Sequence, residues 1–278
     1  MADIIPMNPP ASGGDFSQWN SVINWALAKT CLDFALIRAG YGDSLSYPNQ
    51  VDAQYENNYK GCKSNGVPVG VYYYCYATTV EAAKREAQCC LALLKGKQLE
   101  YPVYYDVEEM DTFRTGKTNE IIKAFADVLE AAGYWVGVYI YRNAAQCYLS
   151  DYTRNRYTLA VAEYGPKLNY SGPVGVWQNS STWTFSGVST RSDHDYCYAD
   201  FPTMIREAGK NGYPKPQPKP ELIYKTTKDT PIVSIKGVEP KGKTVKIGGR
   251  KTVCGVQYGR IDGTKDDWIS LKDATQIK

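Results

Sequence analysis

The feature of this chain that most constrains its fold is the alternation of two kinds of segment between about residue 30 and residue 165. Short, almost entirely apolar segments have the composition of strands that are buried on both faces. The longer segments between them have the apolar spacing of amphipathic helices, and glycines or turns end them. This order predicts a parallel sheet covered by helices and closed into a barrel. The expected helices are residues 52–65, 79–94 and 118–132, and the expected strands are residues 33–41, 69–77, 101–109, 134–141, 158–164 and 174–178.

Residues 101–109 are the most informative strand because an apolar and aromatic run ends there in three acids. Successive side chains of a strand point to opposite faces, so Asp106 and Glu108 emerge on the same side. Two carboxyls at the end of a buried strand raise the pKa of at least one of them, which suits general acid catalysis beside an ionised partner. Glycosidic bond hydrolysis uses such a pair, and barrel enzymes carry their sites at these strand ends. The alternative is a strand whose terminal acids simply meet water.

Histidine and cysteine usage narrows the possible chemistry. The chain has one histidine, His194, so a two-histidine zinc site is excluded and a Cys-His or Ser-His nucleophile could be built only around that residue. No nucleophile motif lies near His194. The eight cysteines show no CxxC pair or other metal-ligand spacing, which predicts small buried thiols in a reducing compartment. We therefore expect carboxylate chemistry with no metal and no cofactor.

The chain lacks the sequence signals for a membrane span or for export. No run of about 18 apolar residues occurs, so no transmembrane helix is expected. Residues 1–6 have no basic segment followed by an apolar one, so no signal peptide is evident.

Alternating prolines at residues 212–220 predict a semi-rigid linker between two domains, residues 1–211 and residues 221–278. Short strand-like segments in the second domain predict a small β-barrel or sheet. These segments are residues 232–235, 244–247, 252–258 and 268–271.

The two domains differ in charge. Residues 221–278 carry 12 Lys and Arg against 7 Asp and Glu, whereas residues 1–212 carry 18 against 22. A basic surface attracts anionic polymers, although lysines that only keep the domain soluble are an equally good explanation. Too few aromatic residues accompany the basic ones to predict a nucleic-acid partner.

An ordered series of segments carries a family resemblance: residues 15–20, 23–25, 34–42, 66–73, 102–108, 133–139, 176–178 and 192–196. Together they resemble the family 25 glycoside hydrolases, muramidases that cut bacterial peptidoglycan, over about residues 13–205. The resemblance implies a flattened (β/α) barrel with an acidic groove at the strand ends. It also favours a catalytic role for Asp106 and Glu108 over acids that simply meet water.

The resemblance implies roles for four acids. Glu108 matches the general acid, Asp106 its partner aspartate, Asp15 the aspartate of the first strand, and Asp193 the aspartate that follows the Trp-Gln segment. Retention of configuration is expected, so Asp106 acts either as a nucleophile or as the stabiliser of a substrate-assisted reaction. The N-terminal stretch before Gly13 is longer than the family pattern.

Aromatic residues at or near the expected strand ends are suited to pack against sugar rings. They are Tyr72, Tyr74, Tyr139, Tyr164 and Trp177, and core packing is the alternative for about half of them. At Tyr73 the chain departs from the family, since many relatives have histidine there.

The second domain is loosely similar to the Src-homology-three-like modules of wall hydrolases, through residues 241–246 and 267–272, which implies binding to peptidoglycan or to anionic wall polymers. The leading hypothesis is an endolysin-type muramidase, held in the cytoplasm of an infected Gram-positive cell until it is released to the wall. The alternatives are an autolysin of the same chemistry, a noncatalytic glycan-binding protein, an amidase or endopeptidase, and a metal-dependent deacetylase, which normally needs histidine ligands.

Overall fold

The computed structural model describes residues 5–216 and, beyond them, residues 223–226, 230–231, 238–239, 244–253, 256–261, 268–271 and 274–276. The chain divides into two compact units, residues 1–216 and 217–278. The division falls within residues 212–220, the predicted linker.

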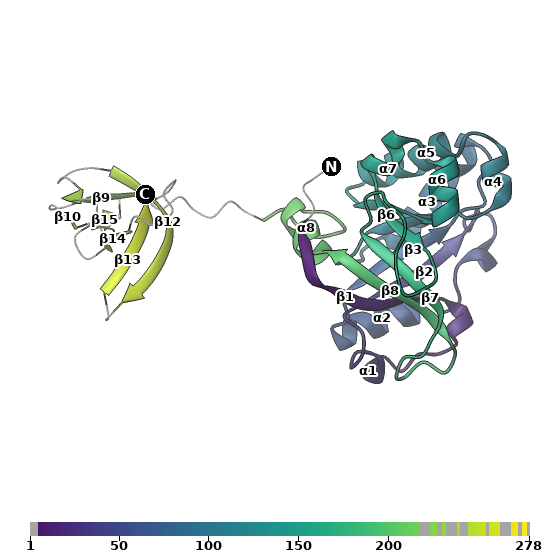
Figure 1. The fold of residues 1–278 in the computed structure, drawn as a ribbon, viewed down its shortest axis with the longest axis horizontal. Helices are drawn as coiled ribbons and strands as arrows, with labels where there is room; N and C mark the ends of the chain where they lie inside the picture. The colour runs from purple at the N-terminus through teal and green to yellow at the C-terminus, as the bar shows by residue number, and fades with distance from the viewer. Residues whose placement is uncertain are drawn as a thin grey trace. The chain divides into compact units, whose positions relative to one another are not determined.

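The first unit is a closed barrel of eight strands in the order β1 to β8 (Figure 1). Neighbouring strands from β1 to β7 are parallel, but β8 is antiparallel to both β7 and β1. The strands are β1 (Pro6–Phe16), β2 (Phe34–Tyr41), β3 (Val69–Tyr74), β4 (Val103–Asp106), β5 (Val136–Tyr141), β6 (Thr158–Ala162), β7 (Val176–Trp183) and β8 (Ser192–Ala199).

The predicted barrel is confirmed, and the predicted strands, which correspond to β2 to β7, are parallel as expected. The antiparallel strand β8 was not among them, so the barrel is mixed and not wholly parallel. Only residues 184–191 separate β7 from β8. A parallel crossover needs a dozen or more residues, so this short connection returns the chain as an antiparallel hairpin.

The three predicted helices correspond to α2, α3 and α5 and begin and end close to the predicted positions, whereas the other five α-helices were not predicted. Thr79 caps α3 by accepting a hydrogen bond from the Ala82 N–H at 3.1 Å, and Gly66 ends α2 with a φ of 70°, which glycine adopts without strain. The α-helices are α1 (Trp25–Ala28), α2 (Tyr55–Asn65), α3 (Val80–Leu94), α4 (Met110–Arg114), α5 (Thr118–Ala131), α6 (Arg142–Tyr148), α7 (Asp151–Arg156) and α8 (Phe201–Ala208), with 3-10 turns at Gln18–Asn20 and Pro48–Gln50. None of the helices within the described residues is long and apolar enough to cross a membrane.

Two apolar clusters hold the barrel together. The larger lies between strands and helices, where the ring of Tyr105 stacks on Phe125 of α5 with centroids 3.8 Å apart. The smaller fills the barrel interior, where Phe201 and Ile205 of α8 pack with residues such as Tyr104. Apolar side chains fill this end of the barrel interior. The polar residues that face the interior therefore lie at the other end.

The described residues of the second unit form a five-stranded antiparallel sheet, β14-β13-β12-β9-β15, and a two-stranded pair, β10-β11. The predicted strand at 232–235 lies outside the described residues, as does Cys254. The strands are β9 (Ile223–Thr226), β10 (Thr230–Pro231), β11 (Val238–Glu239), β12 (Thr244–Val253), β13 (Val256–Ile261), β14 (Trp268–Ser270) and β15 (Ala274–Gln276).

The cysteines of the described part are free thiols. Five are buried, in line with the prediction, but Cys31 and Cys147 are exposed, so the prediction of buried thiols is wrong for these two.

Candidate active site

A pocket of about 330 Å³ opens at the carboxyl ends of the parallel strands. Its walls are mostly the inward-facing residues of the strands, together with residues that follow β1, β4 and β6 and one that precedes β8. The lining consists of Asp15, Ser17, Trp19, Asn20, Leu36, Arg38, Tyr72, Tyr74, Tyr104, Asp106, Glu108, Tyr139, Ala160, Tyr164, Gln178, Arg191, Asp193 and Asp195.

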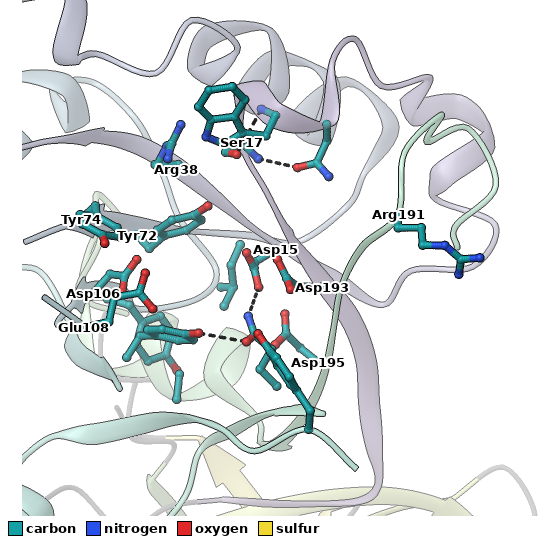
Figure 2. Close-up of a pocket in the computed structure, with 18 residues that line it drawn as sticks. Asp15, Ser17, Arg38, Tyr72, Tyr74, Asp106, Glu108, Arg191, Asp193 and Asp195 are labelled. Atoms are coloured by element: carbon teal, nitrogen blue, oxygen red, sulfur yellow. Dashed lines mark hydrogen bonds between the residues drawn. The ribbon is translucent and has the colours of Figure 1, made fainter. Parts of the chain in front are cut away.

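Asp106 and Glu108 both line this pocket, as their spacing predicted. Asp106 is the last residue of β4 and is 5% exposed, while Glu108 lies just beyond the strand and is partly exposed. In Figure 2 the two carboxyls lie together beside Tyr72 and Tyr74. One carboxyl oxygen of Asp106, Oδ1, is buried without a hydrogen-bond partner in the protein. A buried carboxyl oxygen without a partner favours the protonated form of the acid.

The shared burial of the acids favours their protonated forms. Burial raises the pKa of Asp106 well above its usual range, and the charge of Glu108 raises it further, while the Arg38 guanidinium opposes the rise. Burial also raises the pKa of Glu108, and the neighbouring charges of Glu109 and Asp193 add to the effect. The site therefore retains a proton above the pH at which isolated carboxyls lose theirs.

A second group of acids, Asp15, Asp193 and Asp195, lies apart from this pair in Figure 2. Burial is the main cause that raises the pKa of each, to about 6 for Asp193. The Gln178 amide donates to Asp15 Oδ2 at 2.6 Å and accepts a bond from the Tyr139 hydroxyl at 2.9 Å. The amide oxygen and nitrogen of Gln178 both have hydrogen-bond partners, so its orientation is fixed. The fixed amide in turn orients the Asp15 carboxyl.

Arg38 brings a positive charge to the pocket. Its Nε donates to Asp52 Oδ2 at 2.8 Å, and the buried Asp52 also accepts bonds from the backbone N–H groups of Gln18 and Gln54. Arg191, by contrast, is exposed and points away from the acids in Figure 2. Its guanidinium donates to the Thr182 carbonyl oxygen at 2.7 Å.

The structure places four of the five predicted sugar-binding aromatics, Tyr72, Tyr74, Tyr139 and Tyr164, in the pocket wall. Trp177 is not among the lining residues. It is buried, and its Nε1 donates to the Glu163 carbonyl oxygen at 2.8 Å. Since its strand neighbour Gln178 faces the pocket, alternation turns Trp177 to the other face.

Several lining residues were not singled out from the sequence. Asp195 repeats the i, i+2 spacing of Asp106 and Glu108, and Arg38 is the charged residue of an apolar strand, so both carried a signal. Trp19, 73% exposed at the pocket, stood in a segment that carries the family resemblance. Gln178 also stood in such a segment, but its contact with Asp15 of β1 depends on the fold and could not be read from the sequence.

His194 lies outside the pocket lining. Its ring nitrogens lie 3.0 Å from Ser12 Oγ and 2.6 Å from Asn179 Oδ1, and burial lowers its pKa. It thus connects β1 to β7 and β8. Within the described part of the chain, no three or more His, Cys, Asp and Glu side chains are arranged to hold a metal ion.

Relatives of known structure or function share this barrel. The chain is 28% identical over 181 residues to the autolytic lysozyme of Clostridium acetobutylicum, an alignment that covers 65% of this chain and 53% of that protein. The modular autolysin LytC of Streptococcus pneumoniae, solved with a synthetic peptidoglycan ligand, is 27% identical with a TM-score of 0.61, over 70% of this chain and 48% of that one. The chain thus spans about half the length of these two relatives.

The catalytic domain of the endolysin ply40, from bacteriophage P40 of Listeria monocytogenes, shares the fold with a TM-score of 0.60. It is 22% identical and covers 70% of this chain and 97% of that domain. The model of the glycosyl hydrolases family 25 matches residues 14–193, which is more than half of the chain and includes Asp15, Asp106, Glu108 and Asp193. The chain therefore belongs to the glycosyl hydrolases of family 25.

Proposed function

We propose that this protein is a peptidoglycan hydrolase that cleaves the β-1,4 bond between N-acetylmuramic acid and N-acetylglucosamine. The observation that carries the proposal is the pair Asp106 and Glu108, two acids with raised pKa in one pocket of a family 25 barrel. The names of two relatives, an autolytic lysozyme and an autolysin solved with a synthetic peptidoglycan ligand, support this substrate.

Glu108 is the general acid in this proposal. Its side chain lines the pocket, and burial raises its pKa, which favours the protonated form that can transfer a proton to the oxygen of the leaving sugar. The resulting carboxylate then takes a proton from the water that completes hydrolysis, which returns Glu108 to its starting state.

Asp106 stabilises the positive charge that develops at the anomeric carbon. It does so either by forming a covalent bond to that carbon or by orienting the N-acetyl group of the substrate, which attacks in its place. Ionisation of Asp106 is favoured by Arg38, whose charge lowers the pKa of this carboxyl. Asp15, held by Gln178, and Asp193 complete the acidic wall of the site.

The endolysin role and the delivery route are further parts of the proposal. We place the protein in the cytoplasm of an infected Gram-positive cell until its release to the wall, in line with cysteines that show no CxxC pair or other metal-ligand spacing. Residues 221–278, with 12 Lys and Arg against 7 Asp and Glu, would bind anionic wall polymers and raise the local concentration of the barrel at the wall.

The test is digestion of purified Gram-positive peptidoglycan by the wild type, by Glu108→Gln and by Glu120→Gln, a matched change at an exposed position of α5. We expect new reducing N-acetylmuramic acid ends from the wild type and the control, and a loss of at least about 100-fold for Glu108→Gln. Circular dichroism and wall sedimentation should show that the variant still folds and binds.

Other products would redirect the assignment. Newly freed amino groups would identify an amidase or endopeptidase, and binding without any product would identify a glycan-binding protein. Full activity of Glu108→Gln would refute the role of Glu108.

A further inference from the structure

We infer that Tyr41 and Tyr76 form an outer subsite that binds a sugar ring of the glycan strand beyond the units held in the acidic pocket. The inference rests on the proposed function, because it takes the same polymer as the ligand. Neither tyrosine belongs to the pocket lining. Their position next to it is what points to a continuation of the binding surface.

The two rings continue the pocket wall outward through Tyr74. Tyr74 lines the pocket, and its ring meets Tyr76 edge-to-face with centroids 5.2 Å apart. Tyr76 in turn meets Tyr41 edge-to-face at 5.8 Å. The cluster of Tyr74, Tyr76 and Tyr41 therefore leads without a break from the catalytic acids to the surface.

Tyr76 is exposed although it packs against two other tyrosine rings. Its side chain is 51% exposed, although Tyr74 and Tyr41 pack against it. Tyr41 and Tyr74 are half-buried, and a partly exposed aromatic cluster with polar neighbours is typical of a binding surface rather than of a core. A pyranose ring matches such a surface, since its C–H faces pack on aromatic rings and its hydroxyls reach polar groups at the edge.

Polar groups border the cluster on the side of the catalytic pocket. The Arg38 guanidinium lies over the Tyr41 ring at 5.7 Å from its centroid, and the Tyr74 hydroxyl donates to Glu109 Oε1 at 2.8 Å. The Tyr41 hydroxyl donates to the Asn49 carbonyl oxygen at 3.2 Å, which fixes that ring. The ring faces are thus oriented before a sugar arrives.

Hydrogen bonds to buried residues also hold the loop that carries Tyr76. The Tyr76 N–H donates to Glu86 Oε1 at 3.0 Å, and Thr112 Oγ1 donates to the Ala77 carbonyl oxygen at 2.8 Å. Glu86 is buried on α3, and its other oxygen accepts a bond from the Tyr105 hydroxyl at 2.5 Å. A preorganised loop loses little entropy on binding, which favours affinity for the glycan.

The test uses full-length Glu108→Gln, whose cleavage is expected to be at least about 100-fold slower, and peptide-free peptidoglycan fragments of two and of six sugars. Isothermal titration calorimetry measures their affinity for this parent and for the same protein with Tyr76→Ala or Tyr41→Ala. Removing one stacking ring should weaken binding of the six-sugar fragment about tenfold and leave the two-sugar fragment unchanged. Tyr76→Phe should bind both fragments like the parent.

Tyr152→Ala is the matched control, since Tyr152 is a similarly exposed tyrosine (61%) on α7, outside the pocket lining. Unfolding by urea checks that each variant is folded. Equal affinity of the parent and Tyr76→Ala for the six-sugar fragment would overturn the inference, as would equal losses for both fragments or no binding by the parent. Cleavage by the wild type is measured separately, so failure of the proposed function is seen independently of failure of the subsite.

Discussion

The replacement Glu86→Gln tests whether burial controls the protonation of acids in this protein. Glu86 is 3% exposed on α3 and accepts hydrogen bonds from the Tyr105 hydroxyl and the Tyr76 N–H. Burial raises its pKa from 4.5 to about 7, although these hydrogen bonds oppose the rise. The folded protein therefore binds this proton more tightly than the unfolded chain does.

Because of this difference in proton binding, Glu86 lowers the free energy of unfolding at high pH. Below the unfolded pKa of 4.5, Glu86 is protonated in both states and does not affect the free energy of unfolding. The destabilisation grows as the pH rises and reaches its full size above about pH 7. At about 1.4 kcal/mol per pH unit, the rise in pKa corresponds to about 3 kcal/mol at pH 8. A glutamine keeps both contacts, because its oxygen accepts from Tyr76 and its nitrogen can donate to the Tyr105 oxygen.

We expect Glu86→Gln to match the wild type at about pH 4 and to exceed its free energy of unfolding by about 3 kcal/mol at pH 8. Urea unfolding of the full chain followed by tryptophan fluorescence measures this, since five of its six tryptophans lie within residues 1–216. Other titrating groups are common to both proteins and cancel in the comparison. A difference in stability that is the same at both pH values would refute the reasoning, and Glu120→Gln serves as the exposed control.

Three further changes test the site and the packing. Asp193→Asn removes a charge that raises the pKa of Glu108, so the alkaline limb of the kcat/KM profile on soluble peptidoglycan should move to lower pH; an unmoved limb contradicts this. Trp177→Phe loses one hydrogen bond and should cost about 1 kcal/mol in urea unfolding with KM nearly unchanged, whereas a tenfold rise in KM would show sugar contact. Gly61→Ala places a Cβ 2.0 Å from Trp25 Cδ1 and should cost about 1–3 kcal/mol, so wild-type stability would contradict the observed packing.

The sequence predicted the elements of the barrel well because each strand and helix has its own apolar period. The helix at Thr118–Ala131, for example, ends one residue before the predicted boundary. The direction of β8 was not predictable in this way. It depends on whether the chain returns through a hairpin or through a crossover, and a strand has the same side-chain alternation in either direction.

The faces of the strands were harder to predict than the strands themselves. Both faces of a strand in a covered barrel are buried, so an apolar run does not say which residues face the interior. Trp177 illustrates this, because its apolar strand left both faces open and the structure places it outside the pocket lining. The acids Asp106 and Glu108, by contrast, marked the inward face of β4 directly.

Once the register is known, the inward face of β4 determines the inward face of every other strand. Paired residues of neighbouring strands point to the same side of a sheet. Asp106 pairs with Tyr74 on β3 and with Tyr139 on β5, which places both tyrosines in the pocket. From there the pairing runs through Tyr139 and Ala160, Ala162 and Gln178, Gln178 and Asp195, and Asp195 and Gly13, two residues before Asp15. Asp106 and Asp15 therefore lie on one continuous inward face. Closure of the barrel brings acids that are more than 80 residues apart in sequence into a single site.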